Sequence, residues 1–196
     1  MIKTKDKTLR TVSLGVLSAI IIVLQVIATY FPTKPFAVTF ALIPIIIGSA
    51  IFDEKAGAFL GGVFSAVVIT MCIIGADIGG AMVWNASPVL CVLVCMTKGV
   101  MAGYVSGLLY RLIAKKNSIV ATVVAGLSAP VVNTGIFAAG MMLFFRPVLS
   151  AWSGGSDLLY YVIFTMLGVN FLVEVGVNML LSPVIIKVLE AVKKSR

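Results

Sequence analysis

Hydrophobic residues occur along this chain in six long runs, separated by short polar segments. The runs cover approximately residues 9–31, 36–52, 56–74, 88–113, 119–145 and 158–187. Apolar runs of about 20 residues are typical of transmembrane helices. The pattern therefore predicts an all-α membrane protein with six transmembrane helices, built as a single integral membrane domain over residues 1–196. At about 1.5 Å per residue, the second and third runs barely cross a hydrocarbon core of roughly 30 Å.

The composition supports this interpretation. Of the 196 residues, 61% are hydrophobic and only 11% are charged, too few for the polar surface of a water-soluble domain. The basic stretch MIKTKDKTLR before the first run resembles the start of a signal peptide. Because the run is about 20 residues long and no A-x-A-like cleavage site ends it, we interpret it as the first span.

The basic residues predict how the chain is oriented. There are 15 Lys and Arg against 7 Asp and Glu, but they fall in short caps between the runs instead of one patch, so nucleic acid is not expected as a partner. With a cytoplasmic N-terminus, the outer side receives two of them, Lys34 and Arg146, and Lys98 lies within the membrane. The inner side receives the other twelve: Lys3, Lys5, Lys7, Arg10, Lys55, Arg111, Lys115, Lys116, Lys187, Lys193, Lys194 and Arg196. This asymmetry predicts that both termini are cytoplasmic.

Four polar side chains lie near the middle of apolar runs: Lys98, Asn133, Asn170 and Glu174. Hydrocarbon cannot solvate such groups, so by default they indicate a substrate site or pathway. Asn170, Glu174 and Asn178 are four residues apart and line one face of the sixth span. We expect the fourth, fifth and sixth spans to present a cation, amides and a carboxylate to a common cavity. The alternative is a structural cluster in which Lys98 and Glu174 neutralise each other and the amides join helices.

The connections between the runs differ in length from one side to the other. The inner ones, FDEK and AKKNS, are short, whereas the outer ones, YFPTKPF, GADIGGAMVWNASP and RPVLSAWSGGSD, are longer. We expect the outer loops to cap a ligand pocket, with Trp84 and Asn85 contacting the ligand and Asp77 and Trp152 nearby. The alternative is that these loops are simple connections and that the tryptophans anchor the chain at the membrane interface.

Enzymatic signatures are missing from the sequence. It contains no His, and Cys72, Cys91 and Cys95 lie in or beside apolar runs, so no zinc ligand set is expected and the cysteines are interpreted as packing residues. The G-x-S-x-G, H-E-x-x-H and G-x-x-x-x-G-K-[ST] motifs are also absent. We therefore expect neither an enzyme nor a cofactor, and any ATP-driven step must belong to another subunit.

Small residues recur at helical spacing in two spans. They are Thr11, Gly15 and Ala19 in the first and Gly57, Gly61 and Ser65 in the third. Such residues let helix backbones approach closely in lipid. On the first span they predict either a surface for a partner protein or packing within the chain.

Several of these segments together resemble a known family. The segments LIPIIIGSAIFDEKAGAFLG, VNTGIF and NFLVE, within a likeness that covers nearly the whole chain, are similar to the substrate-binding S components of energy-coupling factor (ECF) vitamin transporters. The subgroup that they resemble includes riboflavin, pantothenate and folate binders.

This resemblance implies a multi-pass subunit of an ABC importer in the bacterial plasma membrane. The subunit captures a vitamin from outside, beneath the loops after the first, third and fifth spans. It then docks to a transmembrane coupling (T) subunit that two ATPase subunits drive. The family's Ala-x-x-x-Ala docking motif on the first helix is matched here by Gly15 and Ala19.

The residues favour one ligand within that family. Lys98 suits a carboxylate, and the amides of Asn133 and Asn170 suit hydroxyl and amide groups, which favours pantothenate. Glu174 is expected to orient Lys98 or a ligand hydroxyl. Riboflavin is the alternative, since Trp84 can offer a stacking surface together with Trp152 and Tyr160. A stand-alone secondary transporter is the rival class, although the two halves of the chain share no obvious repeat.

Overall fold

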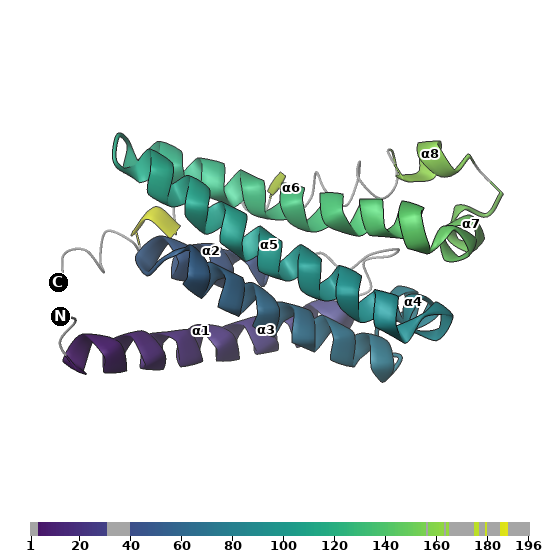
Figure 1. Cartoon of the computed structure of the whole chain (residues 1–196), viewed down its shortest axis with the longest axis horizontal. Coiled ribbons are helices and arrows are strands. Elements are labelled where there is room, and N and C mark those ends of the chain that lie inside the picture. The colour runs from purple at the N-terminus through teal and green to yellow at the C-terminus, as the bar shows by residue number, and fades with distance from the viewer. Residues whose placement is uncertain are drawn as a thin grey trace.

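Helices account for the whole regular structure of the described part of this chain. The structure is a computed structural model, and it describes residues 4–30, 40–155, 157–162, 164, 175, 176, 179 and 185–187. Its helices are α1 (Thr4–Tyr30), α2 (Leu42–Ile51), α3 (Glu54–Ile73), α4 (Ile78–Ala86), α5 (Pro88–Ala114), α6 (Ser118–Phe144), α7 (Arg146–Ser153) and α8 (Leu158–Tyr160). The four long helices, α1, α3, α5 and α6, extend along the long axis of the molecule (Figure 1).

These four helices also have the length and the apolar composition of transmembrane helices. Segments Lys7–Tyr30, Glu54–Ile73, Pro88–Ala114 and Ser118–Phe144 are each long and apolar enough to span it. They confirm an all-helical protein with several apolar helices. Helix α2 has 10 residues, and residues 31–39, where the second run was expected to begin, lie outside the described part. Most of the sixth run also lies outside the described part. The count of six spans and the cytoplasmic position of the termini therefore remain predictions.

Short polar side chains determine where several helices begin. The carboxylate of Asp53 accepts a hydrogen bond from the Ala56 amide at 2.7 Å and caps α3, and Asp77 caps α4 by accepting from Gly80 at 3.0 Å. The Asn117 side chain does the same for α6, accepting from Ile119 and Val120. Each cap satisfies amides that have no partner within the helix. The expected FDEK turn thus becomes a two-residue connection between α2 and α3.

Glycines bring α3 and α5 into close contact. A Cβ atom on Gly61 would collide with the carbonyl oxygen of Gly99, and one on Gly57 would collide with that of Gly103. Ser65 continues this line on α3, and its hydroxyl donates to the Cys95 carbonyl at 2.7 Å. The small residues expected on the third span therefore pack against another helix of the same chain.

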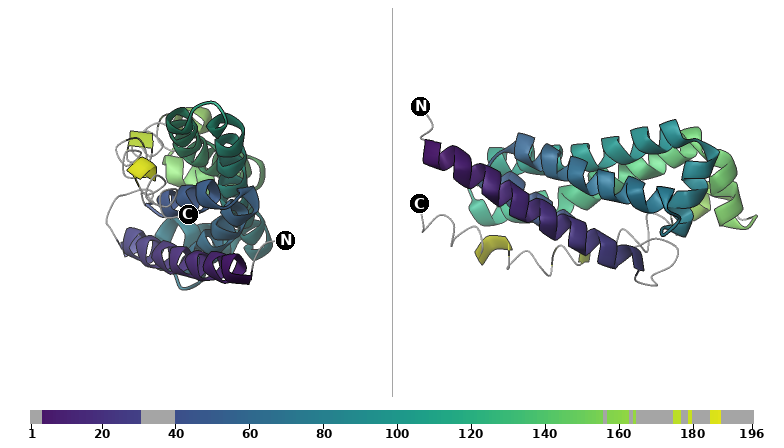
Figure 2. Two further views of the ribbon diagram at one scale, coloured as in Figure 1. Left: turned by 90° about the vertical axis from the view of Figure 1, so that its left-hand side faces the viewer. Right: turned by 90° about the horizontal axis from the view of Figure 1, so that it is seen from below.

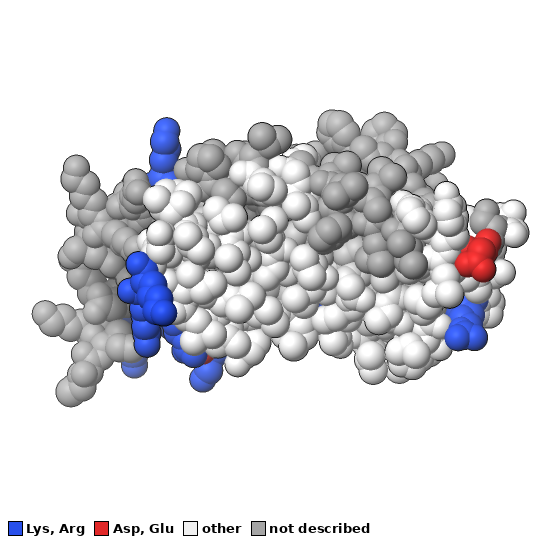
Figure 3. Space-filling view, turned by 90° about the horizontal axis from the view of Figure 1, so that it is seen from above, with Lys and Arg blue, Asp and Glu red and all other residues white. Residues whose placement is uncertain are grey.

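Helix α1 lies on one side of the bundle, where it packs on α2 and α3 (Figure 2). Its N-terminal end is at the same end of the molecule as the α2–α3 and α5–α6 connections (Figure 1). Figure 3 shows Lys and Arg gathered at this end and white, uncharged surface along the middle of the molecule. We call this the basic end; α4 and α7 lie at the opposite end.

Candidate functional site

Lys98 lies in the apolar middle of α5 and faces α6. Its ammonium nitrogen is 4.6 Å from the centroid of the Phe137 ring on α6, within range of a cation–π interaction. Among the described residues no carboxylate is within ion-pair distance of Lys98, because both ion pairs found there involve other residues. A partly buried cation thus lies on a ring face, and no carboxylate of the described residues pairs with it.

Asn133 is one helical turn from Phe137 on the same face of α6. The residue is 6% exposed, and its Oδ1 atom has no hydrogen-bond partner among the described residues. Leaving such an acceptor unsatisfied costs about 1–3 kcal/mol. The Lys98 ammonium group contacts α6 at Phe137, about one helical turn from the Asn133 acceptor.

Trp84 and Asn85 belong to α4, at the end of the bundle opposite the basic end. The Trp84 side chain packs partly buried against the core, whereas Asn85 is exposed. Helix α4 contacts α7, where Trp152 donates from Nε1 to the sulfur of Met82 at 3.2 Å. Two of the three segments expected to be lid loops thus contain short helices, and the first, YFPTKPF, lies almost wholly outside the described residues. Asp77, expected near the ligand, instead caps α4, and an aspartate in this position is a signal from which the first of these helices could have been predicted.

The structure brings together only part of the predicted site. Lys98 of α5 contacts α6 one turn from Asn133, and Trp84 and Asn85 share a different element, α4. Asn170 and Glu174 lie outside the described residues. Sequence reasoning missed Phe137, although its four-residue spacing from Asn133 marks it as a neighbour on the same helix face.

The predicted docking residues lie on the surface of α1. Gly15 and Ala19 are exposed, and a Cβ atom on Gly15 would meet nothing within 4 Å. Thr11 is exposed on the same side. This small-residue strip, Thr11, Gly15 and Ala19, therefore takes no part in packing among the described residues and leaves a shallow surface that a partner helix can approach closely.

Two ion pairs at the basic end join three helices. Arg10 of α1 binds Asp53 at 2.8 Å, and Arg111 of α5 binds Glu54 at 2.7 Å. Burial raises the pKa of Asp53, but the hydrogen bond from Ala56 and the Arg10 guanidinium outweigh it and hold that pKa below its ordinary value. Sequence reasoning predicted a tight turn here and assigned these carboxylates no role.

A family of known proteins matches most of this chain. The family model described as "ECF transporter, substrate-specific component" matches residues 9–186. No curated protein matches the chain.

Proposed function

This chain belongs to the family of substrate-specific components of ECF transporters, and we propose that the substrate it captures is an anionic vitamin, with pantothenate as the favoured candidate. Family membership makes the chain a multi-pass membrane subunit that binds a small molecule for an importer. The identity of that molecule is the part that we infer from the side chains.

The observation that carries the proposal is the environment of Lys98. Its ammonium group lies against the Phe137 ring with no carboxylate beside it among the described residues. A cation within an apolar helix costs about 2.5–3.5 kcal/mol on insertion scales, and an aromatic ring offsets only part of that. A ligand carboxylate would supply the counter-charge that the described residues do not give Lys98, through charge-assisted hydrogen bonds.

Asn133 restricts the ligand further. Its buried, unsatisfied Oδ1 atom needs an N–H or O–H donor, and a ligand that carries hydroxyl or amide groups near its carboxylate provides one. Pantothenate has all of these groups. In our proposal Asn170 contacts the same hydroxyl and amide groups of the ligand. Glu174 orients Lys98 or a ligand hydroxyl. Trp84 and Asn85 contact the ligand from α4.

Titration calorimetry on the purified chain in lipid nanodiscs tests this proposal. Lys98→Ala should weaken pantothenate binding about 10–150-fold, the range expected for losing a charged hydrogen bond. Lys98→Arg should retain much of the affinity, and Lys116→Ala, at the exposed basic end, should leave it unchanged. Circular dichroism checks that each variant is folded. Unchanged affinity in folded Lys98→Ala would overturn the assignment.

Riboflavin is the second candidate, favoured by the partly buried rings of Trp84 and Trp152 near the α4–α7 contact. Riboflavin is neutral, so its binding should be insensitive to Lys98→Ala. Titrating both vitamins into the same variants therefore separates the two assignments.

We further propose that the basic end faces the cytoplasm in a chain of six spans, and that the small-residue strip on α1 docks to the coupling subunit. The exposed positions of Gly15 and Ala19 support the docking surface. Two ATPase subunits would then drive release. Uptake that persists in cells lacking those subunits would instead favour a stand-alone secondary transporter.

A further inference from the structure

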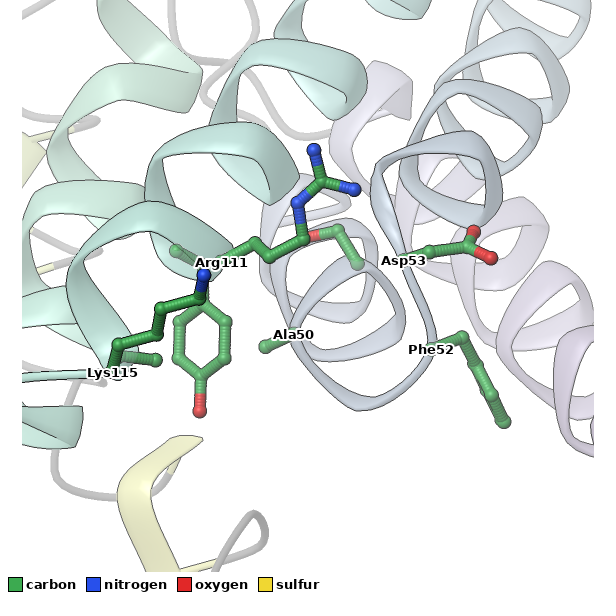
Figure 4. A pocket seen from close by; sticks show the side chains of 8 residues that line it. Ala50, Phe52, Asp53, Arg111 and Lys115 are labelled. Atoms are coloured by element: carbon green, nitrogen blue, oxygen red, sulfur yellow. The ribbon is translucent and has the colours of Figure 1, made fainter.

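A cavity of about 320 Å³ opens at the basic end, far from Lys98 and beside the two ion pairs (Figure 4). It lies between the α2–α3 connection and the C-terminal turns of α5. The lining residues that matter here are Ala50, Phe52, Asp53, Arg111, Ala114 and Lys115. In Figure 4, Ala50 lies between Phe52 on one side and Lys115 on the other.

The cavity keeps an excess of positive charge. Its carboxylate, Asp53, is already neutralised by Arg10. Arg111 uses one nitrogen, Nη1, to bind Glu54, so the rest of its guanidinium has donors left for a second anion. Lys115, the C-cap residue of α5, is one helical turn beyond Arg111, and its side chain forms no hydrogen bond or ion pair with any described residue. Two cations on one side of α5 therefore flank the opening.

The remaining walls are largely apolar. Ala50, Phe52 and Ala114 contribute hydrocarbon and ring surface, and the ends of α2 and α5 here lead directly into apolar helix. Cationic groups next to apolar walls at the end of membrane-spanning helices match the boundary between lipid headgroups and acyl chains. Basic pockets between helices on the cytoplasmic side are suited to phosphate-bearing lipid headgroups.

We propose that this cavity binds the phosphate of an anionic phospholipid from the inner leaflet. Lys115 and the free donors of Arg111 hold the phosphate, and Ala50, Phe52 and Ala114 contact the glycerol and the first acyl carbons. This assignment rests on the proposed cytoplasmic orientation of the basic end and not on the identity of the vitamin. A lipid held there would join the end of α5 to the α2–α3 connection at a defined depth in the membrane.

Quenching of a single tryptophan by brominated lipids tests the proposal. Trp84→Phe and Trp152→Phe remove the native reporters, and Phe52→Trp places one in the cavity wall. We expect brominated phosphatidylglycerol to quench this tryptophan more strongly than brominated phosphatidylcholine. Lys115→Gln should reduce that preference about fivefold, the effect expected for one basic residue near an anionic surface.

Lys116→Gln is the matched control, because Lys116 is the next residue, is exposed and does not line the cavity. It should leave the preference intact. If both variants lost the preference for phosphatidylglycerol equally, the cause would be general surface charge and the proposed site would be wrong. The absence of any such preference in the chain with Lys115 and Lys116 intact would also contradict the site. Displacement of the quencher by inorganic phosphate at millimolar concentration would show a site for free phosphate and overturn the lipid assignment.

Native mass spectrometry gives a second test that needs no introduced tryptophan. The unaltered chain, released from mixed nanodiscs of phosphatidylglycerol and phosphatidylcholine, should retain phosphatidylglycerol preferentially. Lys115→Gln should lose this preference and Lys116→Gln should keep it. Because neither readout uses a vitamin, failure here is distinguishable from failure of the proposed substrate.

Discussion

Arg10, in the first turns of α1, donates from one nitrogen to both carboxylate oxygens of Asp53, at 3.0 and 2.8 Å. Asp53 also caps α3, since its Oδ1 atom accepts from the Ala56 amide at 2.7 Å. One carboxylate thus defines the start of α3 and holds the adjacent end of α1. Because the side chains of Arg10 and Asp53 are 41% and 30% exposed, solvent screens the pair and its contribution is modest.

This arrangement predicts a loss of stability in acid. The folded-state pKa of Asp53 lies below its ordinary value, so the stabilisation is complete above about pH 4 and is lost as the pH falls through the lowered pKa. Melting temperatures measured in detergent from pH 6 to pH 3 should therefore decrease at the acidic end. Asp53→Asn should lower the melting temperature near neutral pH and reduce this decrease. If the melting temperature of Asp53→Asn fell as much between pH 6 and pH 3 as that of the unaltered chain, Asp53 would not be the group responsible.

The α3–α5 contact predicts a sharp difference between two adjacent glycines. Gly61→Ala should destabilise the protein by about 1–3 kcal/mol, because the added methyl group meets the rigid backbone carbonyl of Gly99. Gly62→Ala should be nearly neutral, since a Cβ there lies 3.7 Å from a Val100 methyl group, an ordinary contact. Unfolding in increasing SDS measures both variants. Equal effects would argue against the close approach of the two helices.

The small-residue strip on α1 predicts a defect in assembly without a defect in folding. Gly15→Leu places its side chain in open space, so the melting temperature of the isolated chain should not change. If the strip docks to the coupling subunit, the same substitution should prevent co-purification of the complex, because the partner backbone can no longer approach closely. Val16→Leu is the control, as Val16 is exposed about 100° further around α1. Normal assembly of the complex with Gly15→Leu would show that the coupling subunit docks to another surface of the chain.

Phe137 is predicted to support ligand binding through its ring. Phe137→Leu removes the aromatic face 4.6 Å from the Lys98 ammonium group and should weaken pantothenate binding about two- to fivefold, in line with a cation–π energy of about 0.5–1 kcal/mol. Phe137→Tyr retains the ring and should bind nearly as well as the unaltered chain. Calorimetry in nanodiscs compares the two. Equal losses in both variants would indicate a packing effect instead.

Much of the fold is predictable because it depends on local sequence. Apolar length alone indicates the helices α1, α3, α5 and α6, since a segment in hydrocarbon must satisfy its backbone groups internally. The spacing of Gly57, Gly61 and Ser65 likewise predicts a close helix contact. The helices α4 and α7 were missed, because their short, mixed sequences suit a loop and a helix almost equally.

The sequence by itself determined the class of this protein, its family and the position of Lys98 and Asn133 within long apolar segments, because composition, run length and residue order carry that information. Only the tertiary structure decided which groups meet. Phe137 as the neighbour of Lys98, Asp53 as the partner of Arg10 and the cavity beside Lys115 all depend on side chains distant in sequence. Helical periodicity defines the face on which a residue lies, but the packing of one helix on another selects its partner.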